Sequence, residues 1–256
     1  MVTKVLITPE GASVSSGVPA RDSLLAKYAG AGLGAGRVSS DPPETLPSEA
    51  ELALAWSSPK VRGSLSIALH LDRRLARIVA RTSEPMLGQM RLAWWRESLA
   101  KPVAQRPRGD EVLDAIGREW AGREAALTRL IDGWEALVTA DRMGQDEAAA
   151  FGAARGAFFA ALVPAATLAV NERLETAGFR WAIADAATRV SDADERAAMI
   201  AAGLSRAEGG GRVPADLRGI AVLEALALRA MRRGGRPLME GRGASLAALK
   251  AAIFLN

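Results

Sequence analysis

The sequence predicts an all-α protein, and three observations lead to this prediction. Hydrophobic residues make up 49% of the 256 residues, with Ala, Leu and Arg the commonest types, so a sizeable core can form from good helix formers. Aromatic residues make up only 5%, and the β-branched and aromatic residues that strands favour are scarce. Apolar residues recur at three-to-four spacing over most of the chain after Pro47. We expect about eight to ten helices in one domain.

The N-terminal part differs from the rest. Residues 1–46 include GAGLGAGRVSSDPPETLPS, which is rich in Gly, Ser and Pro and has no apolar period. We expect a disordered or poorly ordered extension there and a single domain over 47–256. The first predicted helix is SEAELALAW, with Ser48 as its N-cap and Glu51 completing a capping box.

Turn residues and caps delimit the other predicted helices. Ser83 is expected to cap the helix that begins at Pro85. In that helix Met86, Met90, Trp94 and the positions from Leu87 to Leu99 give an apolar stripe. Gly152 and Gly156 are expected to allow close helix contact, and Pro164 to kink or end its helix. The remaining helices are predicted over 60–81, 109–117, 123–141, 145–168, 172–190, 193–208, 214–233 and 244–254.

Composition excludes several kinds of chemistry. The chain has no cysteine, which excludes disulfides, thiolate catalysis and zinc–cysteine sites. His70 is the only histidine, and no G-x-S-x-G segment accompanies it, so a serine triad is not expected. The pI is about 9.9, but arginine is spread along the chain, so no nucleic-acid partner is expected. No run of apolar residues suggests a membrane span or signal peptide, and we expect a cytoplasmic protein.

Three segments carry a resemblance to a known family. The first is ALHLDRRLARIVA followed by EPMLGQMRLAWWRESL. The second is LTRLIDGWEALVTADRMGQDEAAAFGAARGAFFAAL at 127–162, and the third is GRVPADL at 211–217. In this order the chain resembles the squalene/phytoene synthase family, the head-to-head prenyl synthases. It is most similar to short bacterial members and the related mitochondrial complex I assembly factor. The resemblance covers about residues 47–235.

The resemblance implies a fold and a reaction. The fold is an isoprenoid-synthase-like bundle around a central cavity. The reaction joins two prenyl diphosphates, with Mg²⁺ held by aspartates that two facing helices supply. The first aspartate motif of the family aligns with DRRLARIVA at 72–80. Its acidic positions then fall on Ala76, Arg77 and Ala80, so the motif is degenerate in this chain.

The resemblance also points to candidate site residues. Asp72, Asp185 and Asp192 are the candidate metal ligands, although Asp192 reads equally well as a helix cap with Asp194 in SDADE. Trp94 and Trp95 lie about 100° apart on a helix, so they face different neighbours, and simple packing is the alternative to a cavity wall. Candidates for diphosphate binding are Arg73, Arg77 and Arg91; candidates for the cavity wall are Trp94, Trp95 and Trp181.

These observations favour one function and leave two others open. The loss of acids at 76–80 favours a non-catalytic protein that binds a prenyl lipid, a prenyl diphosphate or a protein partner and serves assembly or scaffolding. No cofactor is expected in that case. The first alternative is an active Mg²⁺-dependent prenyl transferase of squalene or phytoene type. The second is a peripheral membrane module, with the basic charge and the exposed tryptophans as its basis.

Overall fold

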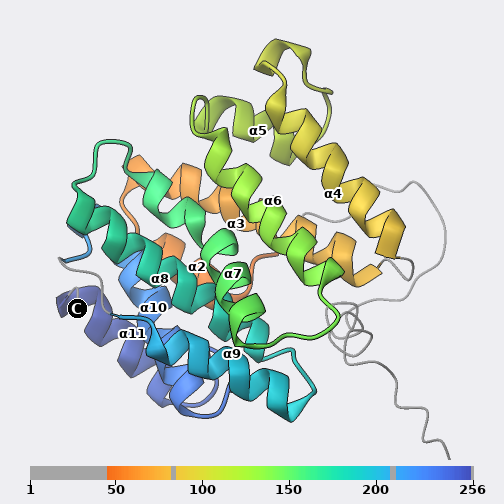
Figure 1. Cartoon of the computed structure of the whole chain (residues 1–256). Helices are drawn as coiled ribbons and strands as arrows, with labels where there is room; N and C mark the ends of the chain where they lie inside the picture. The colour runs from red at the N-terminus through yellow and green to blue at the C-terminus, as the bar shows by residue number, and fades with distance from the viewer. Residues whose placement is uncertain (1–44, 82–84, 208–211, 255–256) are drawn as a thin grey trace, which may run out of the picture.

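The computed structural model describes residues 45–81, 85–207 and 212–254, and in these ranges it contains ten α-helices and no strand (Figure 1). The all-α prediction is therefore confirmed, and so is the predicted number of helices. The helices are α2 (Ser48–Trp56), α3 (Pro59–Arg81), α4 (Pro85–Ala100), α5 (Glu111–Glu119), α6 (Glu124–Thr139), α7 (Gln145–Arg155), α8 (Leu168–Ala187), α9 (Ala193–Ser205), α10 (Arg218–Arg232) and α11 (Gly243–Phe254).

Helix α8 lies at the centre of the molecule. Nearly all of its residues from Arg173 to Ala187 are buried, as expected for a helix with neighbours on every side. It packs against α7, α9 and α10; α10 in turn contacts α2 and α11, while α7 contacts α6, and α6 contacts α4 (Figure 1). Across the described ranges, no helix combines the length and the apolar composition that a bilayer crossing needs.

Buried ion pairs connect α8 to α10. Glu224 of α10 is 2% exposed and pairs with Arg173 and Arg180 of α8. Nη1 of Arg180 lies 2.8 Å from Oε1 of Glu224, and its Nη2 donates to the carbonyl of Arg206. Charges so deep in a core are tolerated because each has an opposite charge or a carbonyl beside it.

Glycines allow α8 to approach the end of α7 closely. A Cβ on Gly156 would lie 2.3 Å from the carbonyl carbon of Gly178, and one on Gly178 would lie 2.3 Å from the carbonyl oxygen of Gly156. Gly152 makes a similar contact, because a Cβ there would lie 2.8 Å from Ile183. The close approach expected at Gly152 and Gly156 is therefore confirmed, and it brings the side chain of Arg155 next to α8.

Two predicted helix ends are wrong. Ser48 is the first residue of α2 and not its N-cap; Pro47 occupies that position, and no side chain caps the helix. The helix predicted over 145–168 ends at Arg155, and a 3₁₀ segment, Ala157–Leu162, follows it before Pro164. Gly156 is the C-cap of α7, so the helix ends before the proline is reached. Ser83 and most of the N-terminal extension lie outside the described residues.

The apolar residues predicted on α4 divide between an exposed face and a buried face. Met86, Met90 and Trp94 do form one stripe, but they are 71%, 63% and 41% exposed. The buried face carries Leu92 and Trp95 instead, both below 4% exposed. The spacing correctly groups the residues that share a face, but it cannot tell which of two apolar faces packs against α6.

Candidate functional site

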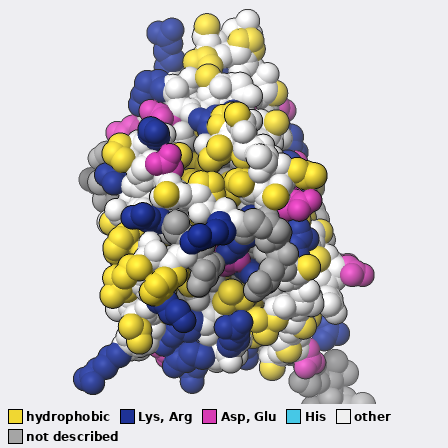
Figure 2. All heavy atoms as spheres, turned by 90° about the vertical axis from the view of Figure 1, so that its left-hand side faces the viewer, with side chains coloured by type: hydrophobic (Ala, Val, Ile, Leu, Met, Phe, Trp, Pro, Cys, Tyr) yellow, Lys and Arg dark blue, Asp and Glu magenta, His cyan; other side chains and the backbone are white. Residues whose placement is uncertain are grey.

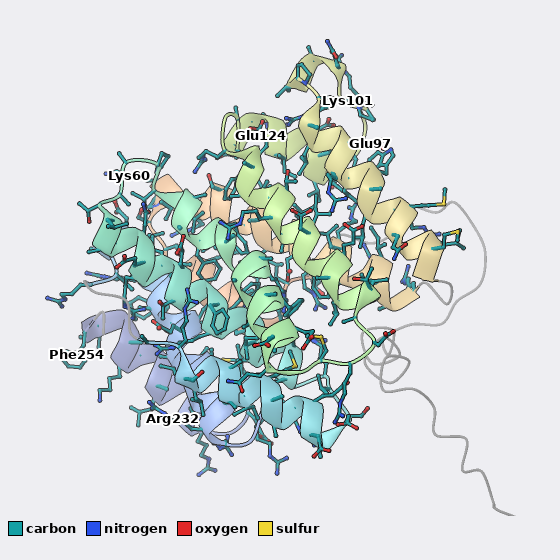
Figure 3. All side chains as sticks on the ribbon, viewed as in Figure 1. Lys60, Glu97, Lys101, Glu124, Arg232 and Phe254 are labelled. Atoms are coloured by element: carbon teal, nitrogen blue, oxygen red, sulfur yellow. The ribbon has the colours of Figure 1, made fainter. Side chains whose placement is uncertain are left out.

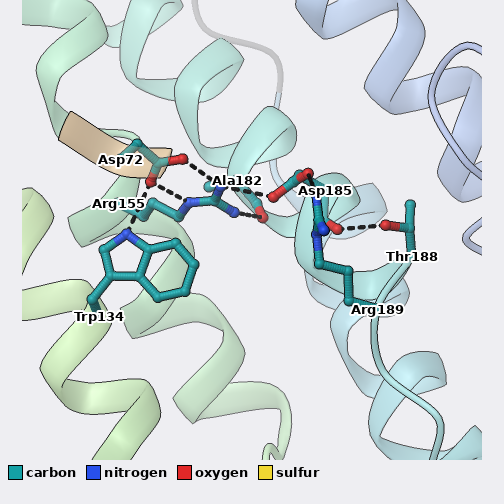
Figure 4. A network of polar contacts seen from close by, with 7 residues as sticks. All are labelled: Asp72, Trp134, Arg155, Ala182, Asp185, Thr188 and Arg189. Carbon is teal, nitrogen blue, oxygen red and sulfur yellow. Dashed lines mark hydrogen bonds and ion pairs between the residues drawn. The ribbon is translucent and has the colours of Figure 1, made fainter. Parts of the chain in front are cut away.

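The centre of the protein contains two aspartates and an arginine from three different helices. Asp72 lies midway along α3, Asp185 lies near the end of α8, and Arg155 is the last residue of α7. All three are buried, with exposures of 1%, 6% and 2%. Figure 4 shows the side chain of Arg155 extending between the two carboxylates.

Each of the three nitrogens of the Arg155 guanidinium donates a hydrogen bond. Its Nε lies 2.8 Å from Oδ1 of Asp72 and its Nη2 lies 2.7 Å from Oδ2, which is a bidentate pair. The same Nη2 lies 2.7 Å from Oδ2 of Asp185, and Nη1 donates to the carbonyl of Ala182 at 3.1 Å. One nitrogen therefore bridges carboxylates from two helices.

Aromatic rings enclose this ion pair. The guanidinium carbon of Arg155 lies 4.8 Å from the ring centre of Trp134 and 4.6 Å from that of Trp181, so the cation lies against both indoles. The indole N–H of Trp134 also donates to Oδ1 of Asp72 at 2.9 Å. Phe159 stacks on Trp181, with the ring centres 5.4 Å apart. These rings cover much of the pair, and such apolar surroundings strengthen it electrostatically.

A second arginine compensates the charge of Asp185. Nη2 of Arg189, one helical turn further on, lies 3.1 Å from Oδ1 of Asp185. Burial alone would raise the pKa of the Asp185 carboxyl, but the charges and hydrogen bonds of Arg189 and Arg155 outweigh it and hold the pKa well below its usual range. Asp185 is therefore ionised at neutral pH, and the cluster contains two carboxylates and two guanidiniums.

The local sequence of α3 explains why Asp72 is the only acid on this face. Ala76 and Ala80 follow it at intervals of four residues, share its helix face, and are also buried. Each alanine presents a methyl group to the interior where the family resemblance expects a carboxylate. Arg77 lies on a different part of the same turn and is half-buried.

A small pocket opens beside the cluster. It has a volume of about 10 Å³, which is room for about one water molecule. Burial, with a smaller contribution from the charge of Asp185, raises the pKa of the half-buried Glu49 at its edge. The lining residues are Leu46, Pro47, Glu49, Ala50, Leu69, Asp72, Arg73, Arg155, Trp181 and Asp185.

The structure brings some of the predicted site residues together. Asp72, Asp185, Arg73 and Trp181 all line this one pocket. Asp192 has a different place, because it is the N-cap of α9 and its Oδ1 accepts the backbone N–H groups of Asp194 and Glu195.

The remaining candidates lie on α3 and α4. Arg77 is half-buried on α3, while Arg91 is exposed on α4. Trp94 and Trp95 of α4 contact each other edge to face, and only Trp95 is buried. The pocket beside the aspartates includes neither tryptophan in its lining.

Sequence reasoning missed Arg155, Trp134 and Arg189. One signal for Arg155 was present, because it is the only charged residue between Glu147 and Glu172. A single charge in such an apolar segment has to be either exposed on a loop or buried with a partner. The sequence does not identify the partner, since Asp72 lies 83 residues away along the chain.

The cluster does not fit a magnesium ion. Mg²⁺ needs carboxylate oxygens that are free to bind it, usually with several waters and phosphate oxygens around it. Here the carboxylates already bind Arg155, and a cation between them would have to displace a guanidinium. Among the described residues, moreover, no group of three or more acidic or histidine side chains is placed to hold a metal ion.

Comparisons of the chain with protein-family models, curated proteins and solved structures find no match. The resemblance to prenyl synthases therefore depends on the three sequence segments alone. Function has to be argued from the geometry of the site, because a fold by itself hosts many activities.

Proposed function

We propose that this chain is a non-catalytic protein of squalene/phytoene-synthase-like build, which acts by binding as an assembly or scaffold protein. The observation that carries the proposal is the position of Arg155, whose Nη2 lies 2.7 Å from both Asp72 and Asp185. In this proposal a fixed side-chain cation takes the place that metal ions would have in an enzyme of this build.

The chemistry of prenyl diphosphates supports a non-catalytic role. A departing diphosphate carries several negative charges, and its departure needs cations that stabilise the charge as it develops. Arg155 cannot supply this stabilisation, because its N–H groups are already directed at Asp72, Asp185 and the carbonyl of Ala182. Asp72 and Asp185 in turn have no oxygen that is free of a cationic or indole donor.

The packing favours a protein partner over a prenyl chain at this site. Pockets that bind small molecules usually have volumes of about 300–1,000 Å³. The pocket beside Asp72 and Asp185 has about 10 Å³. Trp134, Phe158 and Phe159 fill the neighbouring interior and are themselves fully buried. The proposal therefore assigns binding to the surface of the helices, because the described residues leave little room between α3, α7 and α8.

One observation favours the alternative, an active Mg²⁺-dependent prenyl transferase. Asp72 and Asp185 come from two helices and meet at one point, as metal-binding acids of such an enzyme would. This alternative requires Arg155 to leave both carboxylates when substrate and Mg²⁺ bind. The cost is high, because two buried carboxylates lose their partner at once.

Incubation of the purified protein with radiolabelled farnesyl or geranylgeranyl diphosphate tests the proposal, with and without Mg²⁺. We expect neither product nor retained ligand. Turnover that disappears in the Asp72→Asn variant would establish the transferase. Retained ligand without turnover would establish prenyl binding and would contradict the assignment of binding to the surface. The Asp192→Asn variant is the matched control, since Asp192 lies outside the cluster.

A further inference from the structure

The large apolar side chains of helix α11 point away from the protein, and only its small ones are buried. Its buried face consists of alanines: Ala244, Ala248, Ala251 and Ala252. Its exposed face carries the large apolar side chains, with Leu246 69%, Leu249 46%, Ile253 57% and Phe254 55% exposed. Small residues face the core and large apolar residues face outward.

The packing of α11 on α10 explains the alanines. Alanine at a contact lets two helices approach closely, and α11 packs against α10. Its outer side chains then project together from one surface of the protein. Leu246, Leu249 and Ile253 follow each other at three-to-four spacing, and Phe254 lies at the end of the helix, where Figure 3 labels it. Single exposed apolar residues are normal, but an aligned set of four marks an interaction surface.

Among the residues that the structure describes, the charged side chains on α11 and just before it are positive except for Glu240. Helix α11 has no acidic residue, and Lys250 lies within its outer stripe. Arg242 precedes the helix and is exposed, while Arg212 donates from Nη2 to the carbonyl of Phe254. The acid that precedes α11 in sequence, Glu240, already has Arg233 and Arg236 within 3.5 and 3.8 Å.

Figure 2 shows the side of the molecule on which the C-terminal end of α11 lies. In the lower part of this face, hydrophobic side chains gather, and Lys and Arg side chains lie beside and below them. An apolar surface with a basic rim matches a membrane whose headgroups are anionic and whose interior is apolar.

We propose that α11 docks flat on an anionic lipid surface through Leu246, Leu249, Ile253 and Phe254, with Lys250 and Arg242 directed to the headgroups. This inference does not depend on the proposed function, because it uses no residue of the Asp72–Arg155–Asp185 cluster. It is also distinct from the exposed stripe of α4.

Lys250 distinguishes a lipid surface from a second copy of the chain. In a symmetric contact between two α11 helices, Lys250 of each copy would enter an apolar stripe that offers no carboxylate to either amine. On a lipid surface the same side chain can extend along the apolar layer and place its ammonium at the anionic headgroups. The charge therefore disfavours self-association and favours lipid.

Vesicle sedimentation of the full chain tests this proposal. The probes are vesicles of phosphatidylcholine alone and of phosphatidylcholine mixed with phosphatidylglycerol. We expect binding to the mixed vesicles only, weaker at high salt, and about tenfold or more weaker in the Leu249→Ser/Ile253→Ser variant. The matched control is Met86→Ser/Met90→Ser, which removes two apolar side chains of α4 that are even more exposed, and it should leave binding unchanged.

Several results would overturn the proposal. Absence of binding to the mixed vesicles would do so, as would equal binding to neutral vesicles. Loss of binding in the α4 variant but not in the α11 variant would move the lipid contact to α4. If light scattering instead shows a dimer that only the α11 variant disrupts, and no vesicles are bound, the occupant of this surface is a second copy.

Discussion

Arg155 and Asp72 form a bidentate ion pair between α7 and α3, with Nε 2.8 Å from Oδ1 and Nη2 2.7 Å from Oδ2. Both side chains are 2% exposed. In such a position the desolvation cost of two charges offsets much of their attraction, so the intact pair adds little net stability. Removal of one partner is a different matter, since it leaves a buried charge alone.

We therefore expect Arg155→Met to lower the free energy of unfolding by about 3–5 kcal/mol. Methionine keeps much of the volume between Trp134 and Trp181 but leaves Asp72 without its cation. Urea denaturation, followed by circular dichroism at neutral pH, measures the loss.

Arg96→Met is the matched control for this prediction. Arg96 also bridges two acids, Asp132 and Glu135, but on the surface, where its side chain is 35% exposed. Surface pairs contribute about 0–1 kcal/mol. Equal losses in the two variants would show that burial does not set the energy of the Arg155 cluster.

Asp185 gives the protein stability that is lost in acid. Because the two arginines hold its pKa well below the ordinary value of 3.8, the folded state binds fewer protons than the unfolded state there. The contribution of Asp185 to the free energy of unfolding is complete above the pKa that it has in the unfolded state. This contribution is lost progressively as the pH falls from there toward the lower pKa of the folded state. We expect the free energy difference between wild type and Asp185→Asn to shrink when the pH is lowered from about 6 to about 2.5.

Glu49 provides a control in which the pH dependence of stability runs in the opposite direction, because its pKa is raised and not lowered. Burial raises its pKa above the ordinary 4.5, so its contribution is present at low pH and is lost as the pH rises through the folded pKa. The stability of wild type relative to Glu49→Gln should therefore fall as the pH rises from acid toward neutral. If the stability of wild type relative to Asp185→Asn and relative to Glu49→Gln changes with pH in the same direction, the stated pKa directions of Asp185 and Glu49 are contradicted.

The order and limits of the helices could be predicted because their signals are local. Pro85 begins a helix where expected, and the predicted segments match the observed ones to within a few residues except after Arg155. The inner and outer faces of α4 could not be predicted in this way. Both faces of that helix carry apolar residues, and only the position of α6 decides which is buried.

The candidate site could be predicted only in part, because its acids have sequence signals and its cation does not. The family resemblance points to Asp72 and Asp185 as candidate metal ligands, and the structure brings them together. Arg155 joins them from 83 and 30 residues away, through a contact that depends on the glycines beside it. Such long-range pairing depends on how three helices cross, and no spacing in the sequence encodes it.

Gly178→Ala should destabilise the protein, because the new Cβ would lie 2.3 Å from the carbonyl oxygen of Gly156. Backbone atoms cannot move aside as the end of a flexible side chain can. We therefore expect the free energy of unfolding, measured by urea denaturation, to fall by about 1–3 kcal/mol or more. Gly63→Ala in α3 is the control, since its Cβ would meet only the exposed carboxylate of Glu119 at 3.1 Å. That change should be neutral or stabilise by up to about 1 kcal/mol.

Asp192 allows a direct distinction between a helix cap and a metal ligand. Its Oδ1 accepts the N–H groups of Asp194 at 2.9 Å and Glu195 at 3.0 Å, and these hydrogen bonds lower the pKa of its carboxyl. Asparagine offers an amide oxygen at the same place and caps helices as well as aspartate does, whereas alanine offers none. We expect Asp192→Ala to lower the Tm and to speed amide exchange in the first turn of α9, while Asp192→Asn resembles wild type.

Measuring the Tm of wild type and of both Asp192 variants with added Mg²⁺ separates a helix cap from a metal ligand. A cap acts through the backbone alone, so added Mg²⁺ should leave the Tm of wild type and both variants unchanged. A metal ligand would behave differently, because a neutral amide binds Mg²⁺ much less well than a carboxylate. A Tm that rises with Mg²⁺ in wild type and fails to rise in Asp192→Asn would assign Asp192 to a metal site and would reopen the transferase alternative.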